Sequence, residues 1–384
     1  MLARRLLPIA VSLAVALAIA LALAGCAKPS QQSGSTATAG TAKPFKIGVM
    51  TGTVSQGEED FRAGQQIEAK YPGRVKHVTY PDNFMNEQET VIAQLTGLAA
   101  DPEVKVIVIA QAIPGSVAAA RKIREQRKDV LIGFINPHED PDVVDRACDI
   151  AVQADQLARG VTIIDNAQKM GAKNFVHYSF PRHMSQLLLA QRRDVMKAEC
   201  EKRGMKFYFV TAPDPMGEGG LPASQQFILE DVPRQVAKLG KETAFYTTND
   251  GMQEPLIKSI LASGGIFVEQ DVPAPTAGYP AALGMAIPPD KAGDMDWING
   301  EIKRLLAEKH ASGRFGSWVA PIDMVSARAV TNLLVDAVDH KADFRDSTTV
   351  ERYLTAECNN SPVKMRRYSP TGNQFLIVLD HITY

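Results

Sequence analysis

The sequence predicts an α/β fold with two lobes, each built from a parallel sheet that is sandwiched by helices. Short runs of β-branched and apolar residues alternate with longer amphipathic stretches, which is typical of βαβ units. This alternation starts twice along the chain. About 340 residues follow position 43, too many for one ordinary core, so we expect two lobes joined by a hinge.

The first series of elements begins at Phe45. Its expected strands are 45–50, 75–80, 104–110, 130–135 and 150–153, and its expected helices are 57–70, 86–100 and 116–126. The strand at Val104–Ala110 is almost continuously β-branched, as a strand covered on both faces should be. A parallel sheet between two helical layers therefore opens the globular part.

The second series follows residue 154. Helices are expected at 155–170, 184–203, 224–239 and 253–262, and strands at 174–180, 206–211, 243–248 and 266–269. Later elements are expected as a strand at 282–287, a helix at 292–310, an apolar stretch at 318–322, a helix at 324–340 and a strand at 374–379. We expect these to complete both lobes, the first from 44–154 plus about 288–322 and the second from 155–287 plus about 323–384.

The N-terminal segment has the pattern of an export signal. Arg4 and Arg5 precede an almost wholly apolar stretch, residues 6–24, which leads to Gly25 and Cys26. Leu-Ala-Gly-Cys resembles the bacterial lipoprotein box, which implies cleavage after residue 25 and a fatty-acyl (palmitate-type) anchor on Cys26. An uncleaved membrane anchor is the alternative, since ~20 apolar residues can span a bilayer. Either interpretation predicts an extracytoplasmic protein held at the cell membrane.

Residues 26–43 are expected to form a flexible tether. Beyond Cys26 they are small or polar, with no large apolar side chain to bury. Acyl chains contribute ~0.8 kcal/mol per buried methylene, so a multiply acylated cysteine would hold the protein at a membrane without a spanning helix.

Charge and cysteine usage exclude several classes. Lys and Arg total 42 against 43 Asp and Glu, so no nucleic-acid partner is implied. Cys148, Cys200 and Cys358 form no CxxC pair, which argues against a zinc site and a dense disulfide framework. Free thiols are the favoured interpretation, although one bridge is possible. No cofactor is predicted.

Three strand-and-loop segments resemble the repeating pattern of type I periplasmic binding proteins. They are Phe45–Gly52, Val104–Gln111 and Ala244–Gly251. With the closing segment Arg366–Asn373, the sequence is similar to an uncharacterised lipoprotein family within that superfamily. The resemblance implies two Rossmann-like lobes that close on a small solute, with an ABC transporter permease as partner. We expect a monomer.

Candidate ligand contacts are polar residues just after the strands, because ligands of open α/β sheets bind beyond the carboxyl ends of the strands. In the first lobe they are Thr51, Thr53, Gln56, Asp82, Gln111, Asn136 and His138. In the second lobe they are Tyr178, Ser179, Arg182, Asn249, Asp250 and Gln253. Each has a structural alternative, such as a helix cap or a turn. The polar types favour slightly a neutral solute rich in hydroxyl or amide groups.

Two other functions are weighed against solute binding. A sensor would use the same fold and present its closed form to a membrane receptor. A membrane-tethered hydrolase is disfavoured because GxSxG, HExxH and the lactamase motifs are missing from the sequence, so we predict no enzyme and no catalytic residue. The segment 138–140 and the pair His177 and His183 could ligate a metal, but a solvated loop and a cleft rim explain them better.

Overall fold

A computed structural model describes residues 44–54 and 56–384. The predicted signal segment, the lipidation residue Cys26 and the tether lie outside the described residues. Residues 44–384 fold as a single unit that contains two separate larger sheets. The α/β prediction with mostly parallel sheets flanked by helices is confirmed.

The first sheet has seven strands in the order β11-β12-β5-β4-β3-β1-β2. Their bounds are β1 Lys46–Thr51, β2 Val75–Thr79, β3 Val104–Ile109, β4 Leu131–Ile135, β5 Ile150–Ala154, β11 Lys364–Arg367 and β12 Gln374–Val378. All neighbouring pairs are parallel except β11 with β12. The fully buried pattern of β5 and β12 explains their continuous apolar sequence, since both faces are covered.

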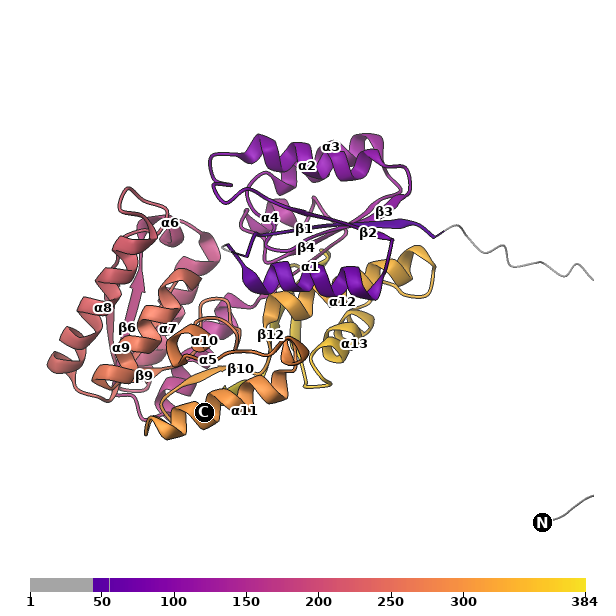
Figure 1. The fold of residues 1–384 in the computed structure, drawn as a ribbon. Helices are drawn as coiled ribbons and strands as arrows, with labels where there is room; N and C mark the ends of the chain where they lie inside the picture. The colour runs from indigo at the N-terminus through magenta and orange to yellow at the C-terminus, as the bar shows by residue number, and fades with distance from the viewer. Residues whose placement is uncertain (1–43, 55) are drawn as a thin grey trace, which may run out of the picture. The chain divides into compact units, whose positions relative to one another are not determined.

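Helices cover both faces of this sheet (Figure 1). On one face lie α2 Gln88–Ala100 and α3 Ser116–Gln126, and on the other α1 Glu58–Lys70 and α12 Ile322–Val338, which packs on β3, β4 and β5. The almost wholly buried α12 is covered in turn by α13 Ser347–Glu357. The short helix α4 Pro141–Val144 precedes β5.

The second sheet has four parallel strands in the order β7-β6-β8-β9. Its strands are β6 Asn174–Ser179, β7 Lys206–Thr211, β8 Thr243–Thr247 and β9 Ile266–Phe267. The helices of this part are α5 Gln156–Lys169, α6 Pro181–Met184, α7 Leu187–Lys202, α8 Gly220–Leu239, α9 Gln253–Ser263, α10 Tyr279–Leu283 and α11 Met295–Glu308, with 3₁₀ turns η1 Asp250–Met252 and η2 Pro289–Lys291. A two-stranded antiparallel ribbon joins β10 Gly316–Trp318 to β13 His381–Thr383.

The late elements complete the sheets in a different way from the sequence prediction. Strand β12 pairs with β5, and α12 packs on the first sheet, so residues 323–378 do not belong with the second lobe. Phe315 bridges to Phe267 in β9, which places residues around β10 with the second sheet rather than the first. The physical reason is that β5 presents an open parallel edge, which β12 covers.

The predicted strand 282–287 is wrong. Tyr279–Leu283 is a helix, in which Pro280 stands in the first turn and Gly284 ends the helix in the left-handed conformation. Pro at the start and Gly just after the end are typical of a short helix. The strand prediction relied on the apolar residues of the segment and did not use these two positions. Elements α13, β11 and β13 were not predicted.

Within the described part of the chain, none of the helices combines the length and apolar composition needed to cross a bilayer. The three thiols in that part are free: Cys200 and Cys358 are buried, and Cys148 is half-buried.

Candidate functional site

A cleft of about 600 Å³ lies at the carboxyl ends of strands from both larger sheets. From the first sheet its lining includes residues that follow β3, β4 and β5, and from the second sheet residues that follow β6, β7, β8 and β9. Loops and helix N-termini meet at such an edge, which makes it the usual ligand position in open α/β sheets. Small-molecule sites commonly have volumes of ~300–1,000 Å³, so the cleft suits a small ligand.

Three lining residues have a strained backbone. Gln111, Asn136 and Asn249 have φ angles of 49°, 46° and 115°, in the left-handed region that side chains other than Gly rarely adopt. Each follows the end of a strand: β3, β4 and β8 respectively. A strained backbone conformation persists only where the surrounding structure fixes it, and such residues cluster at functional sites. Here the three strained residues all line the same cleft.

The structure brings about half of the predicted contact residues to the cleft. Those that line it are Gln56, Gln111, Asn136, His138, Arg182, Asn249 and Asp250. Those that do not are Thr51, Thr53, Asp82, Tyr178, Ser179 and Gln253. Among the second group, Thr53 and Asp82 are hydrogen-bonded to each other.

The buried members of the second group have partners inside the protein. Thr51 donates to the carbonyl of Gly52. Tyr178 Oη donates to Asp231 at 2.9 Å, Ser179 and Thr248 share a 2.6 Å hydrogen bond, and Gln253 donates to backbone carbonyls. Thr51, Tyr178 and Ser179 are still strand residues, so their side chains point into a helix-covered face rather than over the end of the sheet. Tyr178, which is fully buried, is therefore not placed to contact a ligand in the cleft.

Several polar lining residues were missed from the sequence, among them Gln153, Gln156, Arg159 and Asp271. Gln153 is near the end of β5, and Asp271 follows β9 by four residues, so the strand-end rule could have found both. Gln156 and Arg159 are in the first turn of α5, and no local pattern marks them.

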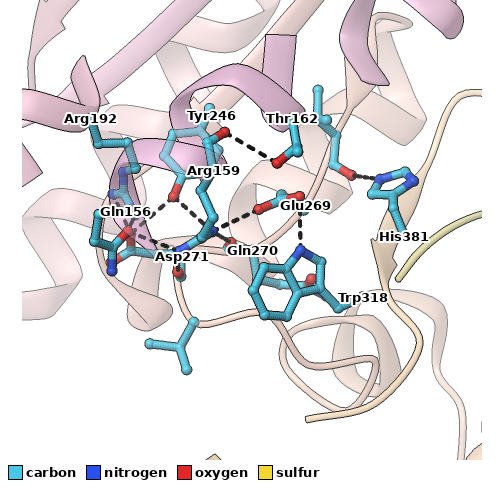
Figure 2. Close-up of polar contacts among 12 residues, drawn as sticks. Gln156, Arg159, Thr162, Arg192, Tyr246, Glu269, Gln270, Asp271, Trp318 and His381 are labelled. Carbon is cyan, nitrogen blue, oxygen red and sulfur yellow. Dashed lines mark hydrogen bonds and ion pairs between the residues drawn. The ribbon is translucent and has the colours of Figure 1, made fainter. Parts of the chain in front are cut away.

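A buried ion-pair network, drawn in Figure 2, lies behind the lining residues Arg159 and Asp271. Arg159 donates to Glu269 at 3.0 and 2.7 Å, and Arg192 donates to Asp271 at 2.7 Å. The Glu269 carboxylate also accepts from the indole N–H of Trp318, which is buried. Every charge in the network has a charged partner, as buried ions require. The network holds Arg159 and Asp271 at fixed positions.

The second arginine of the cleft is also paired. Arg182 donates to both oxygens of Asp214 at 2.9 Å. Although burial acts to raise it, the pKa of Asp214 is lowered by the hydrogen bonds from Arg182 and from the backbone N–H of Met216. The guanidinium of Arg182 is thus occupied by this carboxylate.

Three helix N-termini near the cleft are occupied by carboxylates of the chain. Glu139 accepts from the backbone N–H of Val117 in α3, Asp140 caps α4, and Asp155 caps α5. Such termini are the usual binding points for anionic ligands. The N-terminus of α7, at residues 187–189, also lines the cleft and has no side-chain cap, so the cleft keeps one helix N-terminus with free backbone donors.

Two buried polar atoms in the lining have no partner. They are Nε2 of Gln153, beside the first sheet, and Nδ1 of His183, on α6 beside the second. Gln153 is 5 % exposed and His183 9 %. Burial, together with the positive charge of nearby Arg182, lowers the pKa of His183 and of His138 to about 4, so both rings are neutral at pH 7. Because these groups lie on opposite sides of one cleft, they are available to hydrogen-bond a ligand from both sheets.

The histidines do not form a metal site. Among the described residues, no group of three or more His, Cys, Asp or Glu side chains is placed to hold a metal ion. His177 is buried in the second sheet, where its ring packs against Phe209 and Tyr246.

Solved structures share this fold. A putative transcriptional regulator from Clostridium difficile 630 superposes with a TM-score of 0.75 at 24% identity, covering 88% of this chain and 99% of that one. An ABC transporter periplasmic solute binding protein from Actinobacillus succinogenes 130z, with bound D-allose, gives 0.53 at 12% identity over 78% and 93%. A sugar ABC transport substrate-binding protein from Bordetella parapertussis 12822 gives 0.54 at 11% identity over 89% of each chain. The fold is that of type I periplasmic binding proteins.

Sequence relatives place the chain more narrowly. An uncharacterized protein of Treponema pallidum (strain Nichols) is 38% identical over 200 residues, which cover 50% of this chain and 89% of that protein. A second protein of the same strain is 38% identical over 174 residues, covering 45% and 81%. A family model described as "Protein of unknown function (DUF3798)" matches residues 45–316. The chain is a member of this DUF3798 family.

Proposed function

We propose that this protein is an extracytoplasmic, lipid-anchored solute-binding protein that captures a small polar solute and delivers it to an ABC importer. The observation that carries the proposal is the cleft of about 600 Å³, whose polar lining comes from both larger sheets. A solute in that position contacts both parts of the protein at once. Its binding energy then favours a closed arrangement over an open one.

The lining supports binding rather than catalysis. Its histidines are neutral, its arginines are paired with carboxylates, and its unpartnered atoms are neutral donors or acceptors. No nucleophile and base are paired among the polar groups of the cleft that are described above. Neutral amides and imidazoles are suited to hydroxyl and amide groups of a solute.

The fold and the export-signal pattern support the importer assignment. Neighbours with the same fold include proteins named as ABC transporter solute-binding components. The signal pattern and Cys26 support anchoring at the outer face of a membrane, where such a protein meets a permease. We propose that it acts as a monomer.

A thermal-shift screen of the purified full chain tests the function. The panel contains sugars, amino sugars, nucleosides, amino acids, polyamines and small anions. A ligand at one hundred times its Kd adds about 2.7 kcal/mol to the free energy of unfolding, a readable rise in Tm. A rise confined to one chemical class, with the compound recovered unchanged, is expected. No rise with any class would contradict the proposal, and recovery of a chemically altered compound would favour an enzyme.

A further inference from the structure

A small side cavity continues the cleft towards the junction of the two sheets. Gln111, Asp250 and Val272 line both spaces. The side cavity holds about 10 Å³ of water-sized space, enough for one water or one small polar group. A ligand in the main cleft can therefore extend one substituent into it.

The charged groups that line this side cavity are all carboxylates. Glu59 and Asp60 come from α1, Asp250 from η1 and Asp323 from the N-terminus of α12. Among the described residues that line the cavity, no Lys, Arg or His is present. The acidic charge thus has no cation facing it from any of the three elements or from segment 272–277.

The carboxylates differ in how well their oxygens are satisfied. Glu59 accepts from Thr276 at 2.8 Å, Asp250 from the backbone N–H of Val272 at 3.2 Å, and Asp323 from Asn136 at 2.9 Å. Asp60 is 1 % exposed, and neither of its oxygens accepts from an N–H or hydroxyl of the described residues. Oδ2 of Asp323 also lacks a donor.

The group within reach of Asp60 is another carboxyl, that of Asp323, and the two can bond only by sharing a proton. The side-chain amide of Gln111, in the same lining, also lies close to Asp323 and acts to lower its pKa. Burial, together with the neighbouring carboxylates, raises the pKa of Asp60 well above its usual range. Burial likewise raises the pKa of Asp323 to about 7 and that of Asp250 well above normal. At neutral pH the cluster thus requires positive charge with N–H donors, or a retained proton.

We propose that the solute carries a protonated amino group, which enters the side cavity and donates hydrogen bonds to Asp60 and Asp323. This inference rests on the proposed solute-binding function and names the class of solute, a small polar amine such as an amino sugar. An ammonium supplies charge and three donors in the volume of one water, which matches acceptors that lack partners.

Matched compounds test the amine directly. Binding to the purified full chain is measured by calorimetry with D-glucosamine, D-galactosamine and 1,4-diaminobutane, each against its hydroxyl counterpart D-glucose, D-galactose or 1,4-butanediol. We expect at least one amine to bind at least about tenfold more tightly than its counterpart. For that amine, titration in two buffers of different ionisation enthalpy is expected to show proton release near pH 7, because the ammonium displaces the shared proton.

Variants locate the amine. Asp60→Asn keeps the shape of the side chain. It is expected to weaken binding of the amine by at least about tenfold, while the affinity for the hydroxyl counterpart changes less than about threefold. The control is Asp290→Asn, because Asp290 is exposed and lies outside both linings; it is expected to change neither the affinity for the amine nor that for the hydroxyl counterpart. An amine that keeps its affinity in Asp60→Asn would overturn the inference.

Other outcomes separate this inference from the proposed function. Hydroxyl compounds that bind as tightly as or more tightly than their amine counterparts would overturn the inference and leave solute binding intact. A full screen with no ligand of any class would remove the proposed function and the inference with it.

Discussion

Asp60 is a buried carboxyl group that receives no hydrogen bond from the part of the protein that the structure describes. It is buried on α1, faces other carboxylates, and has no donor among the described residues. A buried carboxylate in such surroundings is costly as an anion, so the folded protein holds protons there that the unfolded chain would release. This makes its contribution to stability depend on pH.

The sign of that dependence follows from the raised pKa of Asp323, about 7, against an unfolded value of about 4. Between these values the native state binds more protons than the unfolded state, so this contribution to stability falls as pH rises. His138 and His183, with pKa lowered to about 4, act in the opposite direction between about pH 4 and 6.5. A comparison of variant and wild type removes the contribution of the histidines.

We predict that Asp60→Asn stabilises the ligand-free protein at pH 7.5 by about 1–2 kcal/mol, because above the pKa of Asp323, about 7, the wild-type pair Asp60 and Asp323 loses its shared proton. At pH 5, below that pKa, the pair keeps the proton, so the difference should be smaller. Urea unfolding at both pH values measures it. An equal difference at pH 5 and 7.5 would contradict the coupling between Asp60 and its neighbours.

A second prediction concerns the buried pair Arg159 and Glu269, both fully buried. Arg159→Met leaves the Glu269 carboxylate without its cation and should cost about 3–5 kcal/mol of unfolding free energy. The double variant Arg159→Met/Glu269→Gln removes both charges and should recover much of that loss. Chemical denaturation of the two variants decides it, and a double variant no more stable than the single one would show that the pairing is not the cause.

At the scale of elements, the sequence predicted most helices and strands before residue 270 within a few residues. Their signals are local: β-branched runs such as that in β3 and amphipathic periodicity such as that in α5. The placement of β12 was not predictable in the same way. The apolar sequence of β12 indicates only that helices cover both of its faces. Its neighbouring strand, β5, depends on which sheet has an open edge, and the sequence of β12 does not specify that.

The site shows the same division. The strand-end rule located Gln111, Asn136 and Asn249, whose positive φ angles turn them to the cleft. It failed for Tyr178 and Ser179, because both are still within β6, where side chains point into the helix-covered faces of the sheet rather than beyond its edge. The role of Arg159 could not be predicted from the sequence, because its ion-pair partner Glu269 is distant along the chain.

The position of β12 gives a prediction for this scale. Ile377 is fully buried between the helices that cover the first sheet, so Ile377→Ala should cost about 2–5 kcal/mol. Lys364→Ala, on the exposed face of the edge strand β11, should change stability by less than about 0.5 kcal/mol. Denaturant unfolding measures both, and similar effects at the two positions would contradict the assignment of β12 to the interior of the sheet.

At the scale of the whole molecule, the chain passes between the two sheets at three places. These follow β5, precede α12 and follow β12 (Figure 1). Several connecting segments restrict relative motion of the lobes to bending about one region, the arrangement that hinge closure around a ligand uses. The acidic side cavity lies beside the second of these segments, at Pro321–Asp323.

The central claim is that one solute occupies the cleft and contacts both lobes. Calorimetric titration of the compound identified by the screen tests it with Gln153→Ala, His183→Ala and the exposed control Gln226→Ala. We predict one binding site, with affinity at least about tenfold weaker in each of the first two variants and unchanged in the control. Unchanged affinity in both Gln153→Ala and His183→Ala would place the solute outside the cleft and contradict the account.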